Sequence, residues 1–151
     1  MSAPAQRALV LVGGAGLFVA LAVDTFAMLG RHLRLPLLGS IEIVQAAVLV
    51  AACSALVVAT LANAHARVHL LQRRAAPRVR DALEIFHGAC ALLFVISLLL
   101  GSYWLTRDLW PGFEESELLR IPYRPLRVLT LATLAALTAM LVWRTLRRWR
   151  R

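Results

Sequence analysis

Four long apolar segments follow one another along the chain, separated by short polar stretches. They cover roughly residues 8–29, 41–63, 82–105 and 125–143. A helix rising about 1.5 Å per residue needs about 20 apolar residues to cross a hydrocarbon core about 30 Å thick, and each segment is close to that length. The pattern predicts an all-α integral membrane protein, with the whole chain forming one domain of four transmembrane helices.

Composition supports a membrane protein. Of the 151 residues, 60% are hydrophobic, whereas soluble domains are nearer half apolar. The formal net charge is +9, and all 17 Lys and Arg residues are Arg. A basic chain can bind nucleic acid, but these arginines flank the apolar segments. We therefore expect the lipid bilayer, and no nucleic acid, to be the partner of this charge.

The arginines also predict an orientation, because short arginine-rich loops stay in the cytoplasm. With four spans, both termini share a side with the second connection, residues 64–81. That side carries eleven arginines and the opposite side six, so we expect both termini inside. The first apolar run is too long for the hydrophobic region of a signal peptide and has no convincing cleavage site, so we interpret it as an uncleaved first span.

The second apolar segment carries a stripe of small residues. Its alanines recur every four residues, at Ala47, Ala51, Ala55 and Ala59. Small residues at this spacing let another helix backbone approach closely in a bilayer, so we predict that the stripe is a packing surface. Ser40 is expected to cap the start of this helix.

Ionisable residues in the spans are functional candidates by default. Asp24 interrupts the first span about one and a half turns from its end, where it can reach the interface or hydrogen-bond to Gln45. Glu42 begins the second span, where a carboxylate favours a helix N-terminus and can also bind an arginine of a partner. Glu84 and His87 share a face of the third span, and the sequence assigns them no role.

We assign no catalytic, cofactor-binding or metal-ligating residue from the sequence, so the chain is not expected to be an enzyme. His65 and His69 are four residues apart, but no glutamate follows His65 as in a zinc protease motif. A haem b between helices needs histidines facing each other within the bundle. His65 and His87 are the only two histidines that could ligate such a haem from the same side of the membrane. A small haem-bearing electron carrier of the membrane therefore remains an alternative function.

Three short motifs resemble the DctQ-like family, the small membrane subunit of tripartite ATP-independent periplasmic (TRAP) transporters. The first motif resembles the segment that leads into the family's second span and consists of Arg31-His32, Pro36 and Gly39-Ser40-Ile41-Glu42-Ile43. A second motif resembles the region after that span and consists of His65–Leu71 followed by Pro77-Arg78-Val79-Arg80. A third motif, Ser116-Glu117 through Ile121-Pro122, resembles the segment that leads into the family's last span. The chain departs from the family pattern at His32, Ala64 and His69.

The resemblance implies a non-catalytic scaffold subunit in the bacterial inner membrane. Its implied partners are a large DctM-like membrane subunit, which carries the substrate and sodium sites, and a periplasmic DctP-like solute-binding protein, which delivers an organic acid. Beside the electron carrier, an orphan structural membrane protein remains the other alternative. The residues expected to contact a partner or another helix are Arg31, Glu42, Ala47, Ala51, Ala55, Ala59, Arg67 and Glu117.

Overall fold

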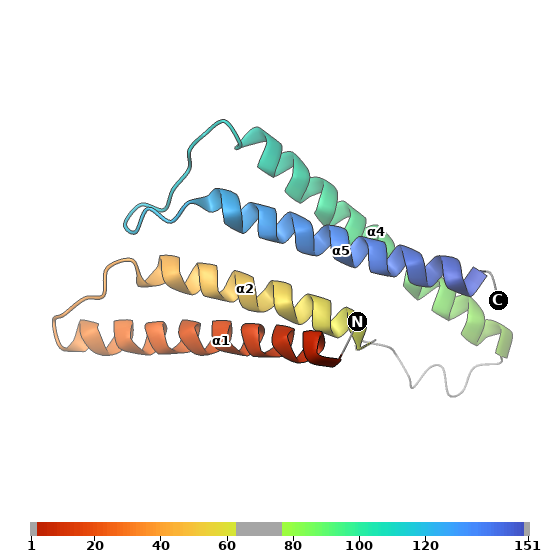
Figure 1. The fold of residues 1–151 in the computed structure, drawn as a ribbon, viewed down its shortest axis with the longest axis horizontal. Coiled ribbons are helices and arrows are strands. Elements are labelled where there is room, and N and C mark those ends of the chain that lie inside the picture. The colour runs from red at the N-terminus through yellow and green to blue at the C-terminus, as the bar shows by residue number, and fades with distance from the viewer. Residues whose placement is uncertain (1–2, 63–76, 150–151) are drawn as a thin grey trace.

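The computed structural model describes residues 3–62 and 77–149, which fold into four α-helices (Figure 1). These are α1 (Ala3–His32), α2 (Ser40–Leu61), α4 (Pro77–Asp108) and α5 (Tyr123–Trp149). Each contains a stretch that is long and apolar enough to cross a membrane. The predicted class of all-α protein with four membrane-spanning helices is confirmed.

Three of the helices continue past both ends of the apolar segments that predicted them. α1 reaches His32, three residues beyond the predicted end at 29, and α4 extends from 77 to 108 around the predicted 82–105. Hydropathy marks only the part of a helix that lipid can cover, whereas the backbone hydrogen-bond ladder continues through the flanking arginines. α2 differs, because it ends at Leu61 instead of 63.

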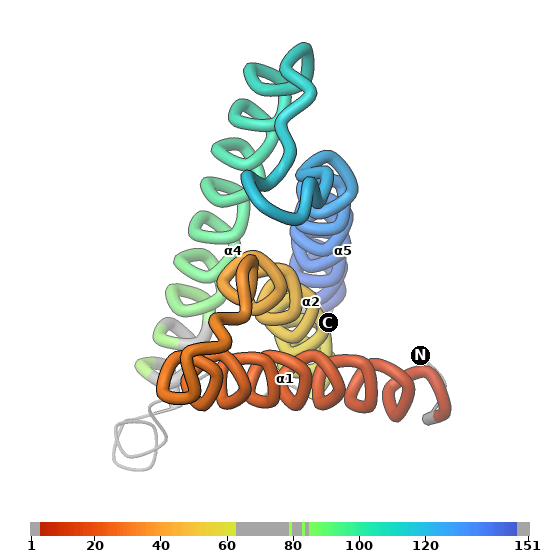
Figure 2. The backbone as a smooth tube through the Cα atoms, turned by 90° about the vertical axis from the view of Figure 1, so that its left-hand side faces the viewer, coloured from red at the N-terminus to blue at the C-terminus, as the bar shows by residue number. Residues whose placement is uncertain are grey.

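The helices form two antiparallel pairs that meet along α2 and α5. α1 packs on α2, α4 packs on α5, and α2 also contacts α5. Figures 1 and 2 show the two pairs side by side, with the α1–α2 and α4–α5 connections at one end and both termini toward the other. α1 and α4 therefore lie at the two ends of this series of contacts, with α2 and α5 between them.

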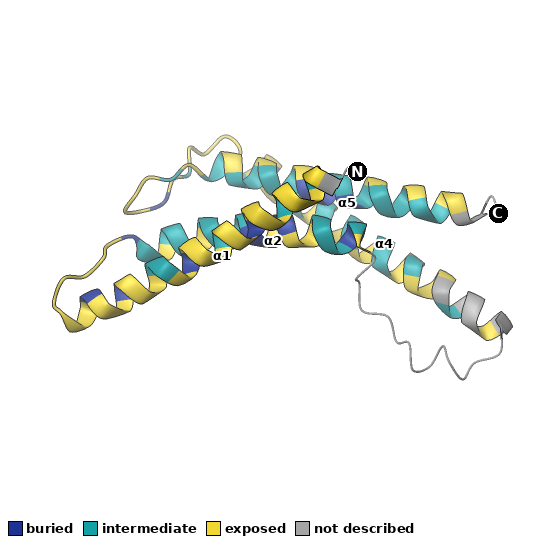
Figure 3. Ribbon diagram, turned by 60° about the horizontal axis from the view of Figure 1, so that its bottom comes forward, coloured by how far each residue is buried: buried dark blue, intermediate teal, exposed yellow. Residues whose placement is uncertain are grey.

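The interior between the described helices is thin and built mainly from small side chains. Its buried hydrophobic residues are Ala20, Ala27, Ala51, Cys53, Leu134 and Leu137. Figure 3 shows exposed positions along most of α1 and α4, and these include large apolar side chains such as Phe18, Phe26 and Trp104. A surface this apolar suits lipid or a protein partner in place of water.

Glycine and alanine hold α1 and α2 close together. A Cβ at Gly16 would lie 2.9 Å from the carbonyl oxygen of Ala47 and 3.3 Å from the Cβ of Ala51, and one at Gly13 would lie 3.1 Å from the Cβ of Ser54. Without a side chain at these positions, the two backbones approach as in other small-residue contacts of membrane helices.

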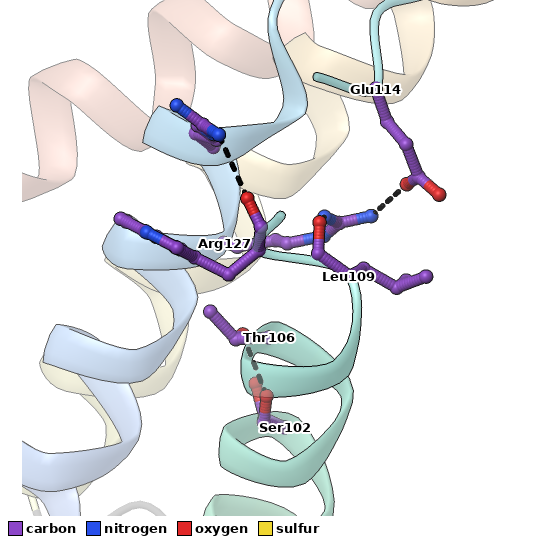
Figure 4. A network of polar contacts seen from close by, with 7 residues as sticks. Ser102, Thr106, Leu109, Glu114 and Arg127 are labelled. Carbon is purple, nitrogen blue, oxygen red and sulfur yellow. Dashed lines mark hydrogen bonds and ion pairs between the residues drawn. The ribbon is translucent and has the colours of Figure 1, made fainter. Parts of the chain in front are cut away.

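Hydroxyl side chains on the helices are satisfied locally. Eight of those that the structure describes donate to the carbonyl oxygen four residues earlier, as Thr106 does to Ser102 at 2.7 Å (Figure 4). The same bond is made by Thr25, Ser54, Thr60, Ser97, Thr130, Thr138 and Thr145. Such bonds let polar residues lie in a membrane span without an unpaired donor.

Candidate functional site

The first turn of α2 is tied to the connection between α4 and α5 through one carboxylate. Glu42 Oε2 accepts a hydrogen bond from the hydroxyl of Ser116 at 2.7 Å and another from the backbone N–H of Leu119 at 2.8 Å. Oε1 accepts from the N–H of Leu118, also at 2.8 Å. Both oxygens of Glu42 therefore bind a loop more than 70 residues further along the chain.

Ser116 shapes the loop that receives Glu42. Its side chain is buried, and its hydroxyl oxygen accepts from the N–H of Ile121 at 2.9 Å, while its own N–H donates to the carbonyl of Ile121 at 3.0 Å. Arg120 adopts a positive φ of 52° between them. This tight turn directs the N–H groups of Leu118 and Leu119 toward α2, where a carboxylate is a strong acceptor.

Gly39 brings the two segments together at the start of α2. It occupies the N-cap position with φ of 80°, and the helix start has no side-chain cap. The prediction that Ser40 caps this helix is therefore wrong, since Ser40 is its first residue. A Cβ at Gly39 would lie 2.7 Å from Leu119 Cγ, so both the left-handed backbone and the close approach require glycine.

Two arginines in the first turns of α5 hold the other half of the same loop. Arg127 forms an ion pair with Glu114, drawn in Figure 4, and donates to the carbonyl of Leu109 at 3.5 Å. Arg124 donates to the carbonyl of Trp110 at 2.8 Å and lies 4.0 Å from the ring centroid of Phe113. These contacts attach the end of α4 to the start of α5.

Two cavities adjoin this junction. One of about 420 Å³ is lined by Glu42, Glu117, Leu118 and Tyr123, with residues of the α1–α2 connection. The other, of about 260 Å³, lies between α1 and α2 and is lined by residues that include Asp24, Arg31 and Gln45. Both lie at the end of the molecule where the short connections meet.

The predicted contact residues fall in different places. Glu42 and Glu117 meet at the junction, where Glu117 is exposed and lines the larger cavity. Arg31 is exposed near the end of α1, and its Nε donates to the carbonyl of Ala27 at 3.4 Å. Arg67 lies outside the described residues, as do His65 and His69. Whether any of these residues contacts a partner stays a prediction.

The alanine stripe of α2 divides between two environments. Ala51 is buried against α1 and Ala47 is partly buried there, whereas Ala55 is exposed and Ala59 partly buried. A spacing of four turns the stripe by about 40° at each step, so it leaves the face toward α1. The contact continues instead through Ser54, which is buried against Gly13.

The remaining ionisable residues of the spans do not gather into one cluster. Asp24 and Gln45 line the same cavity, but within the described residues no hydrogen bond joins them. His87 is exposed on α4. Among the residues that the structure describes, no group of three or more His, Cys, Asp or Glu side chains is placed to hold a metal ion.

Spacing in the sequence does not indicate the role of Ser116 as the link between Glu42 and the loop. The only signal is that Ser116-Glu117 and Gly39–Ile43 each belong to a motif of the family resemblance. Nothing in either motif says that the two meet. The attachments made by Arg124 and Arg127 were likewise missed, although Arg124 lies just before the fourth apolar segment and Arg127 at its start, on the side with fewer arginines.

Comparison with known proteins identifies a family. A family model described as "Tripartite ATP-independent periplasmic transporters, DctQ component" matches residues 20–151. A comparison with curated proteins finds no match, and a comparison with solved structures finds none either. The matched region contains the three spans α2, α4 and α5, most of the second half of α1, and the whole junction around Glu42.

Proposed function

We propose, from the premise that the chain belongs to the DctQ family of small TRAP transporter components, that it is the scaffold subunit of such a transporter. In this proposal it binds a large membrane subunit that carries substrate and coupling ion. A periplasmic solute-binding protein delivers an organic acid to the assembly, and a sodium gradient drives uptake. The observation that carries the proposal is the family match over most of the chain.

The distribution of polar groups is consistent with a supporting role. The carboxylates that form an ion pair or hydrogen bonds between segments, Glu42 and Glu114, lie at the end where the connections meet, outside or at the edge of the apolar stretches. Ion pathways of transporters are marked by ionisable residues facing the bundle interior. Asp24 and His87 are instead exposed on the outer helices α1 and α4. The transported ion and substrate are therefore assigned to the large subunit.

The orientation follows from charge. Eleven arginines lie on the side of the two termini and the second connection, against six on the side of the Glu42 junction. Arginine-rich short loops are retained in the cytoplasm, which supports an orientation with both termini inside and the junction at the periplasmic surface of the inner membrane. The junction then lies on the side from which a periplasmic binding protein approaches.

Uptake by purified components tests the proposal. Proteoliposomes containing this chain and its large subunit, supplied with the solute-binding protein and a sodium gradient, should accumulate a labelled organic acid. Vesicles with this chain alone should accumulate none, and vesicles lacking only this chain should lose uptake. Sodium-driven uptake by this chain alone, or full uptake without it, would contradict the scaffold role. Collapse of the sodium gradient with an ionophore is the control for coupling.

A further inference from the structure

Asp24 is a carboxylate on an outer helix, well inside a stretch that spans the membrane. It lies five residues before Leu29, the last residue of the apolar run, which is about 7.5 Å at about 1.5 Å per residue. Its side chain is exposed, and no described residue forms a hydrogen bond or ion pair with it. A short aspartate within the apolar run is costly wherever it faces lipid.

Asp24 belongs to a regular row of exposed residues. At alternating spacings of three and four, the row consists of Val10, Gly14, Leu17, Leu21, Asp24, Met28 and Arg31. This spacing is that of a seam against one more helix. The face toward α2, with Gly13, Gly16, Ala20 and Ala27, lies about 100° away. α1 therefore has one seam filled by α2 and a second that the described chain leaves open.

The charge of Asp24 indicates what covers the open seam. A second copy of this chain, packed through the same face about a two-fold axis, would bring the two Asp24 carboxylates together at one depth. Like charges facing each other in a dry contact are strongly unfavourable. A different helix with a cationic side chain at that depth would pair with Asp24, and the adjoining cavity of about 260 Å³ has room for its end.

We infer that the seam of α1 centred on Asp24 is the docking surface for the large membrane subunit. In the complex, a Lys or Arg of one of its spanning helices reaches the Asp24 carboxylate. This inference rests on the proposed function, since it names the surface through which the two subunits join. It also explains why the exposed carboxylate is tolerated in a membrane span, because docking removes it from lipid.

Co-purification of the two subunits tests the inference, with Asp24→Leu compared with Thr25→Leu. Thr25 is the next residue, is exposed, and donates its hydroxyl to Leu21 of its own helix, so it matches Asp24 in depth on a different face. Asp24→Leu should reduce the large subunit recovered by about tenfold or more, as for the loss of one partner of a buried charge pair. Thr25→Leu should leave recovery unchanged. Equal recovery with both variants, or equal loss, would overturn the inference.

Two further measurements separate docking from folding and from self-association. The isolated Asp24→Leu chain should melt in detergent no lower than wild type, whereas a lower melting temperature would make Asp24 a folding residue. A photo-crosslinking amino acid at Leu21 should give an adduct with the large subunit, and one at Val19, which is exposed on the far side of α1 from Leu21, should not. A Leu21 adduct of twice the chain's own mass would overturn the inference. Failure of wild type to bind the large subunit would contradict the proposed function itself.

Discussion

Glu42 in the first turn of α2 accepts a hydrogen bond from the buried hydroxyl of Ser116, at 2.7 Å across 74 residues of sequence. Two adjacent backbone N–H groups, of Leu118 and Leu119, complete the carboxylate's contacts. One side chain thus joins the α1–α2 pair to the loop of the α4–α5 pair. From the sequence we predict a helix dipole or a partner's arginine as the role of Glu42, and the structure adds these loop contacts.

Glu42→Gln should destabilise the fold of the isolated chain. The two oxygens accept from donors on both sides, and an amide can supply only one oxygen, so its NH₂ group would face a donor. The melting temperature in detergent should fall, and amide exchange at 116–121 should become faster. Glu117→Gln is the control, since it removes the same charge from an exposed neighbour. Equal effects of the two variants would indicate that charge alone matters.

Gly16→Ala should separate α1 from α2, whereas Gly14→Ala should not. The added methyl at Gly16 would lie 2.9 Å from a backbone oxygen of α2, while the one at Gly14 meets nothing within 4 Å. Overpacking of this kind typically costs about 1–3 kcal/mol. Unfolding of both variants in detergent should show a loss for Gly16→Ala only. A comparable loss for Gly14→Ala would mean that general helix effects outweigh the contact.

The ion pair of Arg127 with Glu114 should contribute modestly to stability. The Glu114 side chain is 41% exposed, and pairs with this much solvent contact are typically worth about 0.2–1 kcal/mol. A double-mutant cycle with Arg127→Ala and Glu114→Ala should give a coupling energy in that range. Arg127→Ala alone should cost more than the coupling energy, because it also removes the bond to the Leu109 carbonyl. A coupling near zero would show that the pair is not maintained in detergent.

Cysteine labelling should establish the orientation. In a chain with Cys53 and Cys90 replaced, a cysteine at Phe113 should react with an impermeant reagent added outside intact cells. Phe113 is 81% exposed in the connection between α4 and α5, which the proposed orientation places in the periplasm. A cysteine at Ala75, in the second connection, should react only after the cells are opened. The reverse pattern would invert the topology while leaving the fold unchanged.

Much of the fold could be predicted because membrane spans depend on local composition. The segments around 41–63 and 125–143 needed only length and apolar character, and α2 and α5 are found there. The alanine stripe was less informative, because a spacing of four diverges from the alternating spacing of a helix seam. As a result Ala51 is buried and Ala55 is exposed.

The junction could not be predicted in the same way. Contact between Glu42 and Ser116 depends on the α2–α5 packing and on the turn at Arg120, whose positive φ no sequence rule for arginine suggests. A sequence contains only the types of its residues and the spacings between them along the chain. A bond between two loops at one end of the molecule depends on how the helix pairs come together, which spacing does not contain.

The one-sided position of the Glu42 junction has a mechanical consequence. The two helix pairs are fastened to each other by hydrogen bonds where the short connections meet, and elsewhere α2 and α5 contact through their helix surfaces. A fastening at one end acts as a pivot, so a force that separates the pairs produces its largest displacement at the far end, near the termini. These hydrogen bonds therefore resist separation of the two pairs most directly at the end proposed to face the periplasm.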